Sequence, residues 1–125
     1  RVALFAKAVE HFPNVTVNFC FVYIIGSALS RRALSAMLET VPVGKIHGFG
    51  GDYIAVEGAY AHAAIARREI ARVLCEKVEE ERFTEEYAAK VGALLLRDNP
   101  IANFGLESRR AAFKPRAGEK PLNAQ

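Results

Sequence analysis

The apolar run VTVNFCFVYII, residues 15–25, constrains the fold more than any other part of the chain. It is rich in β-branched and aromatic residues, which is typical of a strand buried on both faces of a parallel sheet. A second, shorter strand is predicted at residues 45–49. Helical spacing of apolar residues predicts helices over 2–12, 30–40, 59–81 and 84–98. Strands that alternate with helices predict an α/β fold.

Two strands do not make a stable parallel sheet, and each predicted strand is apolar on both faces. The chain also begins at Arg1 without an initiator methionine, and Met37 is its one methionine. We therefore expect the C-terminal piece of a longer protein. Its 125 residues fit at most one domain, which we place at residues 1–106. The basic tail, residues 107–125, is predicted to be disordered.

Charge and cysteine usage narrow the classes of partner. The formal net charge is +3, and before residue 108 no basic face interleaved with aromatic residues is seen. The apolar run is about half the length that a membrane span needs. We therefore expect neither nucleic acid nor membrane as a partner. Cys20 and Cys75 lack metal-ligand spacing, which predicts free thiols in a reducing compartment and a cytoplasmic location.

The segment KIHGFGGD, residues 45–52, is the main candidate for chemistry. A short strand leads into glycines at 48, 50 and 51, and the turn ends at the carboxylate of Asp52. Such a carboxylate can bind a metal ion or accept a proton. The alternative is that Asp52 caps the following helix or orders the turn. The residues of this segment leave both interpretations open.

Three stretches together resemble a known family: VPVGKIHGFGGDY, VEGAYAHAAIARREIARVLCEKV and FTEEYAAKVGALLLRDNPIANFGL. They are similar to the C-terminal end of amidohydrolase-related metal-dependent hydrolases, over about residues 14–106. The resemblance implies the C-terminal portion of a (β/α)8 TIM barrel, with about two βα units and added C-terminal helices. Residues 15–23 would then be the seventh barrel strand and residues 46–49 the eighth.

The resemblance also implies an enzyme, a hydrolase that acts on a small-molecule substrate with a divalent metal ion, zinc or a similar ion. Asp52 would be the catalytic residue, as metal ligand and proton acceptor. The family's histidine ligands would lie upstream, so we expect the fragment alone to be inactive. Tyr23, His47 and Tyr53 are the candidates for substrate binding. Pairing of such barrels through outer helices leaves a homo-oligomer open.

Each of these assignments has a structural alternative. His47 can be a packed or hydrogen-bonded histidine, Tyr53 can belong to a surface loop, and His62 can bond a loop carbonyl. Two other functions also stay open. One is a barrel lyase or isomerase that holds a sugar-acid or phosphorylated substrate at the turn of residues 48–51. The other is a non-catalytic α/β scaffold domain.

Overall fold

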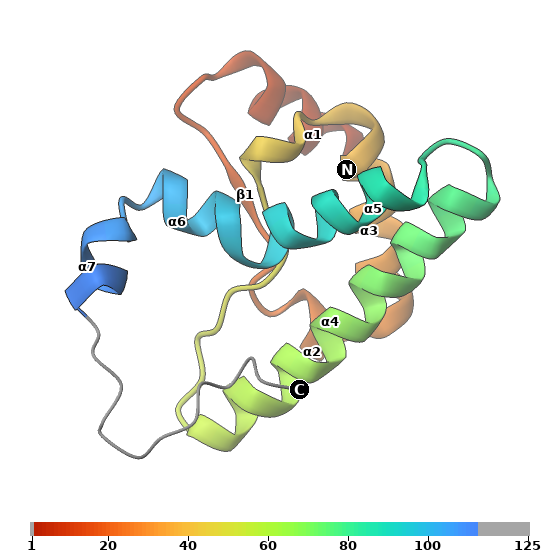
Figure 1. The fold of residues 1–125 in the computed structure, drawn as a ribbon. Helices are drawn as coiled ribbons and strands as arrows, with labels where there is room; N and C mark the ends of the chain where they lie inside the picture. The colour runs from red at the N-terminus through yellow and green to blue at the C-terminus, as the bar shows by residue number, and fades with distance from the viewer. Residues whose placement is uncertain (1, 113–125) are drawn as a thin grey trace.

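The computed structural model describes residues 2–112, which form a mostly helical protein around one small sheet (Figure 1). The elements follow one another in this order: α1 (Val2–His11), β1 (Val17–Asn18), α2 (Val22–Ile25), α3 (Ser27–Thr40), η1 (Val43–Lys45), β2 (Ile46–His47), α4 (Val56–Glu79), α5 (Glu85–Ala93), η2 (Leu94–Asp98), α6 (Asn99–Asn103) and α7 (Glu107–Ala112). Residues 113–125, which make up most of the tail predicted to be disordered, lie outside the described residues. The first six residues of that predicted tail, residues 107–112, form the helix α7, so the prediction of disorder is wrong for them.

The prediction of an α/β fold built as part of a TIM barrel is wrong. Among the described residues the sheet has two parallel strands, paired at Val17 with Ile46 and at Asn18 with His47, and helices make up most of the rest. The run of residues 15–25 does not continue as a strand. Phe21 has a left-handed backbone with φ of 61°, and the four residues after it form α2. A continuous apolar run fits a buried strand and a buried helix equally well, so its composition could not decide.

The core lies where α3, α4 and the helical segment from α5 to α6 pack on the strand pair. Leu34 of α3, Ile46 of β2, Ile70 of α4 and Leu95 of η2 are each at most 1% exposed. In Figure 1, α4 runs diagonally across the molecule, α5 lies beside its C-terminal half, and the segment then leads away from α4 to α6 on the left. Burial of large apolar side chains from four elements fixes the strand pair between the helices.

The segment from α5 to α6 is one helical rod with a π-helical turn, η2, in its middle. The helix predicted over residues 84–98 therefore continues past its predicted end, through Pro100. Proline lacks the backbone N–H that an α-helix needs, and a π-turn accommodates it. Within the turn the Asn99 N–H bonds the Leu94 oxygen, so the Leu95 oxygen would have Pro100 as its π-helical partner. It accepts instead from the Gly48 N–H, at 2.8 Å, which ties β2 to the rod.

The ends of the longer helices follow sequence signals closely. The Thr84 hydroxyl accepts a hydrogen bond from the Tyr87 N–H at 3.1 Å and so caps α5, at the residue where the helix was predicted to start. Glu85 and Glu86 lie in the first turn of the same helix, where negative charge is favourable. The predicted helices of residues 2–12 and 59–81 appear as α1 and α4, with ends that differ from the prediction by at most three residues.

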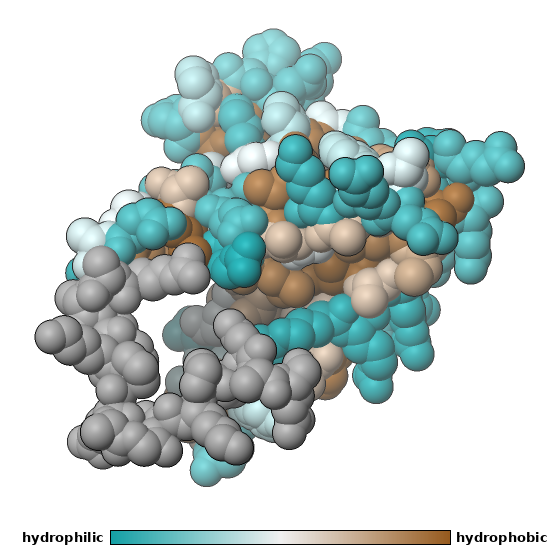
Figure 2. Space-filling view, in the orientation of Figure 1, coloured by the Kyte–Doolittle hydropathy of each residue, from teal (hydrophilic) through white to brown (hydrophobic). Residues whose placement is uncertain are grey.

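One face of the molecule shows apolar side chains where α4 and α5 lie side by side (Figure 2). A surface groove of about 500 Å³ runs between the two helices. Its lining is mostly small and apolar: Ala71, Leu74, Cys75, Val78, Glu79, Glu85, Ala88, Ala89 and Gly92. No helix in the described part of the chain is both long and apolar enough to cross a membrane.

Candidate functional site

The candidate site is the loop of residues 48–55, which joins β2 to α4 and passes the end of β1. A Cβ atom on Gly50 would overlap the Asn18 side chain, so the loop backbone lies directly against the last residue of β1. This close approach explains why glycine is needed at position 50. Because β1 and β2 are parallel, the carboxyl ends of both strands meet at this loop.

Asp52 lies exposed on the loop. The N-cap of α4 is Ala55, which makes no side-chain capping bond, so Asp52 does not cap this helix. The alternative that Asp52 serves as a helix cap is therefore not what the structure has. The residue is exposed two positions after Gly50, the loop residue that lies against the end of β1, so a ligand or substrate can reach it.

Tyr53 packs within a small aromatic cluster next to Asp52. Its ring stacks on His62 of α4, with centroids 4.9 Å apart and planes 12° apart, and it meets Phe21 at 6.0 Å. Burial raises the pKa of the Tyr53 hydroxyl, and the nearby Cys20 adds to the effect. The structure thus brings Phe21, Tyr53 and His62 together next to the loop residue Asp52.

His62 bonds a carbonyl of its own helix, not the loop carbonyl given as its structural alternative. Its Nδ1 lies 2.9 Å from the Gly58 oxygen, one turn earlier in α4. A carbonyl oxygen can only accept, so Nδ1 is the donor in this hydrogen bond. His62 is therefore oriented by its own helix while its ring supports Tyr53.

Tyr23 is buried, and its hydroxyl donates to the Gly48 oxygen at 2.6 Å. Burial, together with the negative charge of Glu69, raises the pKa of this phenol well above its usual range. The group stays protonated and holds the start of the candidate loop through Gly48. Tyr23 thus positions the loop backbone, and its hydroxyl is already engaged by the protein.

His47 is also fully buried, and it contacts the end of α6. Its ring stacks on Phe104 at 5.1 Å, and its Nε2 lies 3.4 Å from the Asn103 side-chain nitrogen. Nδ1 has no hydrogen-bond partner among the described residues. Burial lowers the pKa of His47, which favours the neutral ring. These contacts match the packed alternative for this histidine.

The described residues do not form a metal site by themselves. Residues 2–112 contain no group of three or more His, Cys, Asp or Glu side chains placed to hold a metal ion. Asp52 supplies one possible ligand, and His47 is directed elsewhere, toward α6. The zinc or similar ion that the resemblance implies does not fit these residues alone.

Sequence reasoning missed several residues that shape the loop. Asn18 is a polar residue inside the apolar run, and that interruption was an available signal for a special position. Phe21 and Cys20 lie in the same run and come beside Tyr53 because the chain turns at Phe21. No pattern in the sequence marks that left-handed turn, since aromatic residues seldom adopt it.

Comparison with protein-family models, with curated proteins and with solved structures found no match to this chain. The functional assignment therefore depends on the chemistry and geometry of the loop.

Proposed function

We propose that this chain contributes the catalytic carboxylate of a metal-dependent hydrolase, with Asp52 as metal ligand and proton acceptor. The observation that supports the proposal is the place of Asp52, exposed on the loop where the carboxyl ends of two parallel strands meet. Ligands commonly bind outside the carboxyl ends of parallel strands. A carboxylate in such a position can take a proton from an attacking water.

The proposal assigns the remaining metal ligands to groups outside the described residues, in another segment or another subunit. One carboxylate cannot hold a catalytic zinc ion, which typically has three protein ligands. Tyr53, next to Asp52 and partly exposed, is the residue that we assign to substrate contact. Tyr23 and His47 are buried and act on the site through β2 and the loop backbone.

We further propose a small-molecule substrate and a cytoplasmic location. Cys20 and Cys75 are free thiols, and free thiols persist in reducing compartments. A homo-oligomer is one way in which a second subunit could supply ligands to the Asp52 loop.

The test measures the rate of hydrolysis by the protein isolated from its natural source, with any further segment or subunit attached. A panel of ester, amide and lactone substrates is assayed for the wild type and for Asp52→Asn. We expect the substitution to lower kcat/KM by roughly 10²- to 10⁴-fold, because a proton acceptor is lost. Circular dichroism should be unchanged, because the Asp52 side chain is exposed.

Glu79→Gln is the matched control, since it removes an exposed carboxylate from the opposite end of α4. It should leave kcat/KM within about twofold of the wild type, because surface changes rarely matter. Turnover by Asp52→Asn at the wild-type rate would overturn the proposal. A wild-type protein that hydrolyses no substrate of the panel would also overturn it.

A further inference from the structure

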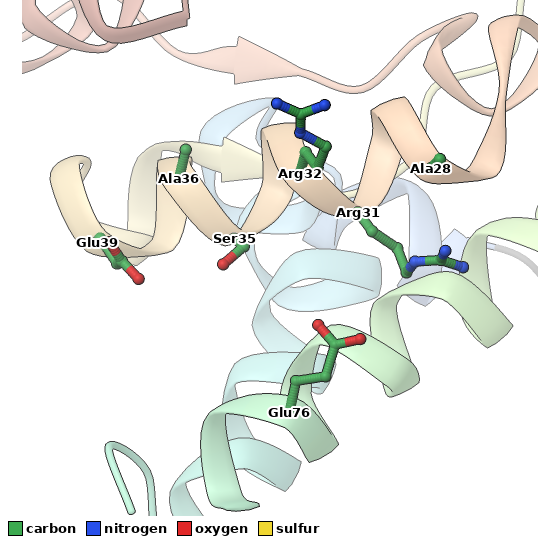
Figure 3. Close-up of a pocket in the computed structure, with 7 residues that line it drawn as sticks. All are labelled: Ala28, Arg31, Arg32, Ser35, Ala36, Glu39 and Glu76. Atoms are coloured by element: carbon green, nitrogen blue, oxygen red, sulfur yellow. The ribbon is translucent and has the colours of Figure 1, made fainter. Parts of the chain in front are cut away.

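A second cluster of charged residues lies on α3 and α4, in elements other than the Asp52 loop. A groove of about 500 Å³ runs between these helices and is lined by Ala28, Arg31, Arg32, Ser35, Ala36, Glu39 and Glu76. In Figure 3, Arg31 extends from α3 toward α4, whereas Arg32 points to the other side of α3. Glu76 extends from α4 toward α3 farther along the groove.

The cluster is organised by Glu69 of α4, whose side chain is 1% exposed. One oxygen accepts from Arg31 at 2.7 Å, and the other contacts Arg72 at 3.0 Å and Arg68 at 3.4 Å. Burial alone would raise the pKa of Glu69, but the hydrogen bond from Arg31 and the charges of Arg72 and Arg31 outweigh it and lower the pKa. The carboxylate is thus ionised and holds three guanidinium groups in place.

Three guanidinium charges and one carboxylate leave the cluster with a net charge of +2. Each guanidinium has five N–H donors, and Glu69 contacts one nitrogen of each group, so most donors are left for another acceptor. The three side chains are 33%, 60% and 53% exposed for Arg31, Arg68 and Arg72, so a solute can reach them. Planar guanidinium groups match the oxygens of phosphate in both spacing and charge.

We propose that Arg31, Arg68 and Arg72 bind the phosphate group of a phosphorylated small molecule beside Glu69, where Arg31 also lines the α3–α4 groove. A phosphate monoester dianion would neutralise the cluster's charge of +2. The groove gives space for the rest of the molecule, and the Ser35 hydroxyl lies along it. The Glu76 carboxylate farther along the groove favours a ligand whose other end is neutral or cationic.

The test is a titration of the 125-residue chain with inorganic phosphate. Binding is monitored through the NMR signals of the arginine Nε–H groups. Ionic strength is held constant with sodium chloride, so that general charge screening does not change. We expect saturable shifts at these arginines and weaker binding of acetate, which carries one charge. Arg31→Gln should weaken phosphate binding by about tenfold, because a charge-assisted hydrogen bond is lost.

Arg68→Lys and Lys90→Gln separate a built site from general attraction. Arg68→Lys keeps the charge and removes the planar fork, so binding should weaken. Arg68 is exposed, so Arg68→Lys should fold normally. It therefore still tests the proposal if Arg31→Gln fails to fold. Lys90→Gln removes one exposed positive charge from α5 and should leave binding within about twofold of wild type. Shifts that do not saturate, equal binding of acetate, or equal losses in Lys90→Gln would overturn the proposal.

Discussion

Replacing Asn99 by aspartate is expected to lower the free energy of unfolding by roughly 3 to 5 kcal/mol at neutral pH. Asn99 is 4% exposed, and its side-chain nitrogen donates to the Val43 oxygen at 2.7 Å and to the Ile46 oxygen at 2.8 Å. An ionised carboxylate has no hydrogen to donate, so both carbonyls would lose their donor and face a buried negative charge. Chemical denaturation with an unchanged m-value measures the difference.

The loss in Asn99→Asp should depend on pH. Burial against two carbonyls raises the pKa of the introduced carboxyl in the folded state above its unfolded value of about 3.9. The protonated form can donate one hydrogen bond, so the variant regains stability below about pH 4 and loses it as pH rises through the folded-state pKa. A loss under about 1 kcal/mol, or one that is independent of pH, would contradict the role assigned to Asn99.

Asn103→Asp is the matched control, since the same change is made one turn later in the rod. Asn103 also donates to a carbonyl, the Gly44 oxygen at 3.1 Å, but it is exposed. Water can replace the lost donor there, so the loss should stay below about 1 kcal/mol.

Replacing Gly48 by alanine is expected to lower the free energy of unfolding by about 2 kcal/mol. An added Cβ would lie 3.0 Å from the Ile70 Cδ1 and Leu95 Cβ atoms and 3.2 Å from the Leu95 oxygen. Relief requires β2 to move from the rod, which weakens the bond from the Gly48 N–H to the Leu95 oxygen. The midpoint of urea unfolding reports the change.

Gly44→Ala is the control for this prediction, because a Cβ there would meet nothing within 4 Å. Its stability should stay within about 0.5 kcal/mol of the wild type. Equal stability of Gly48→Ala and Gly44→Ala would show that β2 does not pack against η2 as described.

The four helices α1, α3, α4 and α5 were predictable from sequence, because their signals are local. The apolar spacing of α4 and the Thr84 cap of α5 each depend on residues within one or two turns. The strands were not predictable to the same degree. The run of residues 15–25 has the composition of a buried strand, but only Val17 and Asn18 pair, because the chain turns at Phe21.

The barrel prediction failed because it required long strands with several neighbours. The structure instead buries two short strands under helices and uses the rod of α5 to α6 as support. The helix was predicted to end at residue 98, but it continues through Asn99 and Pro100. The buried bonds of Asn99 to η1 and β2 have partners more than 50 positions away in sequence. The Leu95 oxygen at the π-turn also has a distant partner, the Gly48 N–H. Local patterns carry no information about such partners.

The candidate site was located by sequence and shaped by the fold. The turn of residues 48–51 and the carboxylate of Asp52 stand out in the sequence, and the loop lies at the ends of both strands. The burial of Tyr23 agrees with the buried run predicted for residues 15–25, and the burial of His47 agrees with its packed alternative. The bond from the Tyr23 hydroxyl to the Gly48 oxygen could not be predicted, because its partner is distant in sequence.

Zinc titration by calorimetry tests directly whether Asp52 is one ligand of a metal site whose other ligands lie outside the described residues. We expect no saturable zinc binding by the 125-residue chain alone. We expect the protein isolated from its natural source to bind one equivalent of zinc, and its Asp52→Asn variant to bind none. Stoichiometric, tight binding by the 125-residue chain, or binding by the protein isolated from its natural source that survives Asp52→Asn, would contradict this proposal.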